Sequence, residues 1–111
     1  MAAPVAVVAG YLVGNPVGGH VLSILHWLAG LRQLGYDVVF VEHHGWANAC
    51  WNPRAQALTD DPAYGLGELT MHAARLGLRG FCFVDQQHRH HGMTPEALEA
   101  ACRESEVLPG L

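Results

Sequence analysis

The spacing of apolar residues changes twice within the first part of the chain. Residues 5–11 (VAVVAGY) are a continuous and largely β-branched apolar run, which predicts a strand covered on both faces. The GNPVGG that follows is incompatible with regular structure and predicts a loop. Residues 20–34 then carry apolar positions at helical spacing, and Gly35 stands where a left-handed helix end is expected. Residues 37–42 (DVVFVE) predict a second short strand.

A second helix is predicted after a long connection. Residues 43–59 are rich in tryptophan, asparagine and proline and show no regular spacing. The Asp61–Pro62 pair is typical of a helix start, and the apolar stripe that follows it ends at Gly77. Gly65 and Gly67 weaken the beginning of this helix, because glycine is a poor helix former.

The remaining pattern predicts one more strand and one more helix. Residues 80–85 (GFCFVD) form a third apolar run, followed by the polar loop QQHRHHGM. Thr94 and Pro95 are suited to the N-cap and first position of a third helix, which Pro109–Gly110 would end.

The predicted order is β-α-β-α-β-α, in which helical crossovers make neighbouring strands parallel. The fold class is therefore α/β, with a Rossmann-like three-layer open parallel sheet in a single domain over residues 1–111. Three strands would leave exposed sheet edges and a thin core. We therefore expect an incomplete N-terminal part of a larger two-domain protein.

Composition and charge narrow the class of protein. The formal net charge is −4, which argues against a nucleic-acid partner, whereas the absence of lysine is interpreted as compositional bias. Cys50, Cys82 and Cys102 are odd in number and unclustered, which favours a reduced cytoplasm over a disulfide framework. Prolines and glycines interrupt the uncharged residues 1–31, and no arginine precedes Arg32, so neither a membrane span nor a signal peptide is expected.

The glycine-rich segment GYLVGNPVGGH, residues 10–20, is the main candidate binding element. It is neither a GxGxxG fingerprint nor a P-loop, which would need a lysine. Gly18 and Gly19 nevertheless precede a helix whose first amides are unpaired and carry partial positive charge, which suits phosphate or carboxylate. The same glycines are equally compatible with a tight strand-to-helix turn.

The run GGHVLSILHWLAGLRQLGYDVVFVE resembles the start of GT-B glycosyltransferases. Those proteins open with a strand and a Gly-Gly at the head of a long helix, which closes with LA..L...G before an aromatic residue or histidine and a second apolar strand. The matching positions here are Leu28, Ala29, Leu31, Leu34, Gly35, Tyr36 and Val38. The specific match covers about the first forty residues, and only the order of elements extends it.

The resemblance implies a function at this loop. Gly14, Gly18 and Gly19 would face the diphosphate of a nucleotide-sugar donor, and the domain would lie on the side of the hydroxyl acceptor. His20 would be the general base, although a helix-capping histidine is the alternative. No cofactor or metal is expected. Because the second half of a GT-B protein is missing, this chain would need it, or a partner chain, for catalysis.

Residues at the predicted strand ends would form the rim and acceptor side of such a cleft, since ligands bind at the carboxyl ends of parallel strands. Glu42, His43, Asp85 and His88 stand there or just beyond, with a solvated strand-end acid as the alternative for Glu42. Trp46, together with Trp51, is suited to stacking on a polyhydroxyl ligand or to capping the open sheet.

Two further interpretations stay open. His88, His90 and His91 invite a metal, but no acid or cysteine stands at ligand spacing, so a metal site is not expected. A His-rich metal-binding protein is therefore the less favoured alternative. The stronger one is a small nucleotide- or anion-binding module that works with a partner chain.

Overall fold

The computed structural model describes residues 3–16, 18–43 and 49–107. In chain order its elements are β1 (Val5–Ala9), α1 (Gly18–Gln33), β2 (Asp37–His43), β3 (Cys50–Asn52), β4 (Ala57–Thr59), α2 (Ala63–Leu76), β5 (Gly80–Val84), β6 (His90–Gly92), α3 (Pro95–Glu104) and β7 (Ser105–Val107). The three predicted helices and the three predicted apolar strands are all present, with shifted ends.

Within the described residues, the main sheet has five strands in the order β6-β5-β2-β1-β7. Strands β5, β2, β1 and β7 are parallel, whereas β6 is antiparallel to β5. The α/β class with a mostly parallel sheet and three helices is confirmed, but the prediction of a three-stranded sheet was wrong. Strands β6 and β7 have three residues each, which is too short for an apolar pattern to reveal them.

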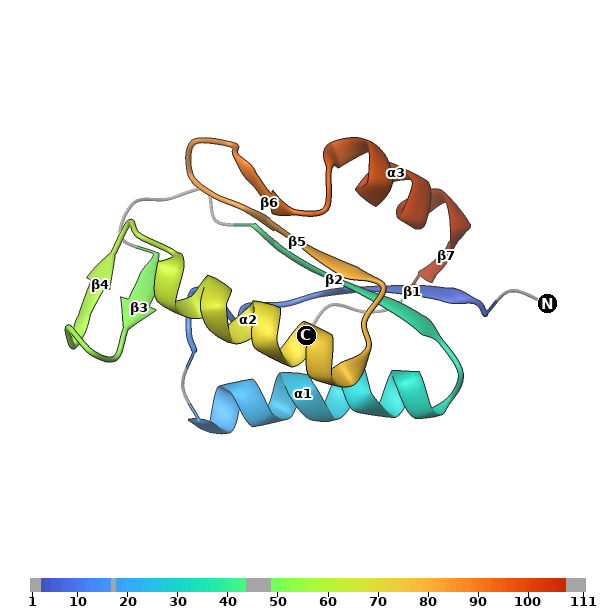
Figure 1. Ribbon diagram of the computed structural model, residues 1–111, viewed down its shortest axis with the longest axis horizontal. Helices are drawn as coiled ribbons and strands as arrows, with labels where there is room; N and C mark the ends of the chain where they lie inside the picture. Colours follow the sequence, from blue (N-terminus) through green and yellow to red (C-terminus); the bar gives the residue numbers. More distant parts are fainter. Residues whose placement is uncertain (1–2, 17, 44–48, 108–111) are drawn as a thin grey trace.

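The helices cover the sheet in two layers, with α1 and α2 on one side and α3 on the other (Figure 1). Phe40 and Phe83 lie in the larger core beneath α1 and α2, together with Leu28 of α1 and Leu69 of α2. The smaller core packs Val5, Val39 and Ala101 beneath α3. The three-layer arrangement predicted from the sequence is therefore present.

Local signals explain several of the helix ends. Gly35 and Gly77 adopt φ values of 92° and 65°, as expected of glycines that follow helices. The Thr94 hydroxyl accepts a hydrogen bond from the Ala97 amide at 3.1 Å and caps α3. The predicted end of this helix was wrong, because the chain is already extended at Ser105, and Pro109–Gly110 lie outside the described residues.

The predicted long connection contains an antiparallel hairpin formed by β3 and β4. The Asn52 side-chain oxygen accepts the amide hydrogens of Arg54 and Ala55 and thereby holds the turn. The hairpin lies beside the start of α2 (Figure 1).

Among the described helices, none combines the length and the apolar character that crossing a membrane requires.

Candidate functional site

The order in which strands are added to the sheet reverses at β1. The strands β2 and β5 follow β1 in sequence through α1 and α2, and they lie on one side of it. The last strand, β7, follows α3 and lies on the other side of β1. The crossover helices lie on opposite faces of the sheet (Figure 1). In open α/β sheets, ligands bind outside the carboxyl end of the strand at such a switch point. That end of β1 leads directly into the glycine-rich loop.

The first half of this loop folds around a carboxylate of the protein itself. Glu42 is 1% exposed, and its Oε1 accepts the amide hydrogens of Leu12 at 2.5 Å and Val13 at 2.8 Å. Its Oε2 accepts the Gly14 amide hydrogen at 2.8 Å. Successive amides that converge on one anion form a nest, the geometry that other loops use for phosphate. Here the anion is internal, and these hydrogen bonds compensate the burial of its charge.

Two further contacts hold the loop in place. A Cβ atom on Gly65 of α2 would lie 2.4 Å from the Val13 carbonyl oxygen, so only glycine permits this close packing. The Trp51 amide donates to the Gly14 carbonyl oxygen at 3.0 Å. The loop is thus fixed by β2, α2 and β3, three elements that are distant in sequence.

The second half of the loop presents the head of α1. Gly18 and Gly19 are exposed, and the space that a Cβ atom on either would occupy is open to at least 4 Å. The first amides of an α-helix have no partner within the helix and point along its axis. His20 Nε2 lies against the Tyr11 carbonyl oxygen, so Nε2 is the donor, and in a neutral imidazole Nδ1 is then the acceptor.

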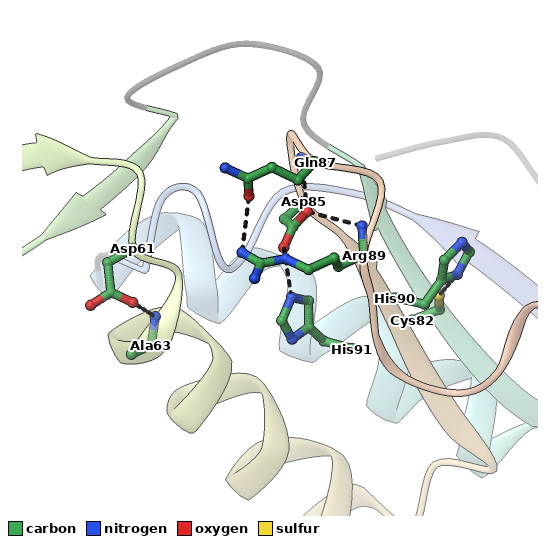
Figure 2. Close-up of polar contacts among 8 residues, drawn as sticks. All are labelled: Asp61, Ala63, Cys82, Asp85, Gln87, Arg89, His90 and His91. Atoms are coloured by element: carbon green, nitrogen blue, oxygen red, sulfur yellow. Dashed lines mark hydrogen bonds and ion pairs between the residues drawn. The ribbon is translucent and has the colours of Figure 1, made fainter.

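Asp85 organises the turn that follows β5 (Figure 2). Its carboxylate is buried and accepts the amide hydrogens of Gln87 and Arg89 at 2.9 and 3.0 Å. Arg89 Nε and His91 Nε2 each lie 2.9 Å from Asp85 Oδ2. Burial alone would raise the pKa of Asp85, but the hydrogen bonds from His91, Arg89 and Gln87 outweigh it and hold that pKa well below its usual range.

The predicted rim residues divide into exposed and buried groups. His43 and His88 are exposed, and their ring centroids lie 6.3 Å apart across the ends of β2 and β5. His88 adopts a φ of 63°, which is uncommon for a residue other than glycine. Glu42 and Asp85 are buried and bind backbone amides, so the alternative of a solvated strand-end acid at Glu42 was wrong. Trp46 lies outside the described residues.

The remaining histidines of the HRHH segment have separate partners. His90 Nδ1 lies 3.4 Å from the Cys82 Sγ atom, whereas His91 is bound to Asp85 (Figure 2). Within the described part of the chain, no three metal-binding side chains converge on one point.

The roles of Gly65 and His91 were missed, and their signals were present in the sequence. A glycine within a helical pattern often marks close backbone packing, which explains Gly65. An acid that ends a strand and precedes a histidine-rich turn could have indicated the pair formed by Asp85 and His91.

No protein-family model, curated protein or solved structure matches this chain.

Proposed function

We propose that this chain is a Rossmann-like domain that binds a phosphorylated, nucleotide-type ligand at the head of α1. In this proposal it is the acceptor-side, N-terminal part of a GT-B-like glycosyltransferase, and the ligand is a nucleotide-sugar donor. The observation that carries the proposal is the reversal of strand order at β1, which is the place where open α/β sheets bind ligands.

The chemistry of the loop supports an anionic ligand. The first amides of an α-helix have no partner within the helix and can donate to phosphate oxygens, and the helix dipole favours negative charge there. No acidic side chain stands in the first turn of α1 to oppose an anion. Gly18 and Gly19 lack side chains, so a phosphate group can approach their backbone closely. Gly14 contributes indirectly, because its amide binds Glu42 and thereby orders the loop.

In this proposal His20 acts during glycosyl transfer. Its Nδ1 atom, which is the acceptor when Nε2 donates to Tyr11, takes the proton of the acceptor hydroxyl. The hydroxyl oxygen forms the new glycosidic bond while the bond between the sugar and the diphosphate oxygen breaks. The departing diphosphate keeps the electron pair and is stabilised by the amides of Gly18 and Gly19. A second domain or partner chain completes the cleft around the nucleotide.

Removal of one amide hydrogen tests the proposed anion site. In Gly18→Pro the amide hydrogen is lost, whereas proline is well tolerated at the first position of a helix. The matched variant Gly18→Ala keeps the amide and adds a methyl group that meets no protein atom, so the loss of affinity in Gly18→Pro beyond that in Gly18→Ala measures the amide. Titration of ¹⁵N-labelled protein with UDP-glucose should shift the amides of Gly19 and His20, and Gly18→Pro should weaken binding roughly tenfold, the loss of about one charge-assisted hydrogen bond.

The outcomes of this titration distinguish a glycosyltransferase domain from a simpler anion-binding module. Absence of any saturable shift at these amides would overturn the anion site. If pyrophosphate binds as tightly as the nucleotide-sugar, the simpler anion-binding module is favoured over the glycosyltransferase domain.

A further inference from the structure

A second candidate site lies between the turn of the β3–β4 hairpin and the first half of α2. It is an open pocket of about 430 Å³, within the size range of small-molecule sites. Residues from both elements line it: Asn52, Arg54, Ala63, Tyr64, Gly67 and Glu68. None of them belongs to the β1–α1 loop, although Gly65 on the adjoining face of α2 packs against that loop.

The polar groups of this pocket have opposite charge and complementary hydrogen-bonding roles. The Arg54 guanidinium lies 5.8 Å from the centroid of the Tyr64 ring, within the range of a cation–π contact. Glu68 lies one helical turn further along α2, where its Oε2 is 3.6 Å from His72 Nε2. The pocket therefore offers the donors of Arg54, the acceptors of Glu68 and an aromatic ring within one small volume.

We propose that this pocket binds a neutral polyhydroxylated ligand, such as a single sugar unit. For a phosphate group the attraction of Arg54 is opposed by the repulsion of Glu68, and for an ammonium group the roles are reversed, so neither ion is favoured as a neutral ligand is. Hydroxyl groups both donate and accept, so they can bond to the guanidinium and the carboxylate at once. The Tyr64 ring and the small residues Ala63 and Gly67 leave room for the apolar C–H face of a sugar ring. The proposal rests on this lining alone and stands if the site at the head of α1 fails.

Gly67 makes the pocket testable without damage to the fold. Gly67 lines the pocket, and nothing lies within 4 Å of its Cβ position, so the fold has room for a side chain there. Leucine is also a better helix former than glycine. Gly67→Leu should therefore fill the pocket and leave the melting temperature unchanged or higher. Gly30→Leu in α1 is the matched control, because its Cβ position is equally open and lies outside this pocket.

The experiment is a titration of ¹⁵N-labelled protein with methyl glycosides of glucose, galactose and mannose. At least one of them should shift the amides of residues 67 and 68 saturably, with a dissociation constant on the order of 1 mM. Gly67→Leu should abolish the shift at residue 68, whereas Gly30→Leu and Gly18→Pro should leave binding unchanged. Arg54→Gln and Glu68→Gln should each weaken binding severalfold.

Several results would overturn the inference. They are the absence of a saturable shift with every glycoside, unchanged binding in Gly67→Leu, or preferential binding of inorganic phosphate or glycine at these amides. If Gly67→Leu loses its helical circular dichroism, Glu68→Gln decides, because unchanged sugar affinity in that folded variant also contradicts the proposal.

Discussion

The Oε2 atom of Glu42 lies 2.8 Å from the amide nitrogen of Gly14, which joins the end of β2 to the loop that leaves β1. Together with the amides of Leu12 and Val13, this contact places the loop around a buried carboxylate. The same loop leads to Gly18 at the head of α1. Glu42 is therefore a positioning residue for the proposed binding site, and its effect on stability can be measured apart from ligand binding.

Removal of the Glu42 carboxylate should destabilise the protein strongly. Glu42→Ala leaves buried amide donors without their acceptor, and we expect a loss of about 3–5 kcal/mol in the free energy of unfolding, as for other buried charge partners. Urea denaturation followed by circular dichroism measures this loss. Glu96→Gln, an exposed substitution in the first turn of α3, removes only an interaction with the helix dipole and should change the free energy by less than about 1 kcal/mol. Equal effects of the two variants would contradict the role of Glu42.

Two glycines of α2 should respond oppositely to the same substitution. Gly65→Ala places a methyl group 2.4 Å from the Val13 carbonyl oxygen, and this overpacking should cost about 1–3 kcal/mol. Gly67→Ala enters open space and should stabilise the helix by up to ~1 kcal/mol. Thermal denaturation of both variants tests the pair. A stabilised Gly65→Ala protein would show that α2 does not pack on the loop in this way.

Asp85 should make the protein sensitive to acid. Its pKa is lowered in the folded protein, so the folded state binds fewer protons than the unfolded state, and protonation favours unfolding. This contribution is fully present above the ordinary pKa of 3.8 and is lost as the pH falls below it. Asp85→Asn should destabilise the protein near neutral pH by about 2 kcal/mol. It should also make the free energy of unfolding fall less steeply as the pH is lowered. Unfolding free energies measured from roughly pH 7 to pH 2 test this. An acid decline identical in the two proteins would contradict it.

The cysteines should differ in their reactivity toward thiol reagents. Burial, and then the negative charges of Glu42, Asp60, Asp61 and Asp85, raise the pKa of Cys50 to about 11. Burial also raises the pKa of Cys82, whereas Cys102 is exposed on α3. Because the thiolate is the reactive form, the folded protein should react rapidly at Cys102 alone. Mass spectrometry after brief exposure to iodoacetamide identifies the modified residue, and rapid modification of Cys50 would be inconsistent with this packing.

The elements with strong local signals could be predicted from the sequence alone. Continuous apolar runs indicated β1, β2 and β5, because strands covered on both faces need apolar residues at every position. Helical spacing, the Thr94 cap and the glycines at 35 and 77 indicated the helices and several of their ends. The short strands carried no such signal, since backbone pairing with a neighbour creates them.

For the candidate site, the sequence by itself determined where glycine, acid and histidine stand relative to the strand ends. It did not determine which of these groups face solvent. Glu42 and Gly14 are 28 residues apart, and their hydrogen bond depends on the parallel pairing of β1 with β2. Likewise, only the packing of α2 on the loop explains why Gly65 must be glycine. Such contacts join segments distant in the chain, so tertiary structure alone decided that Glu42 supports the loop and that Gly18 and Gly19 are exposed.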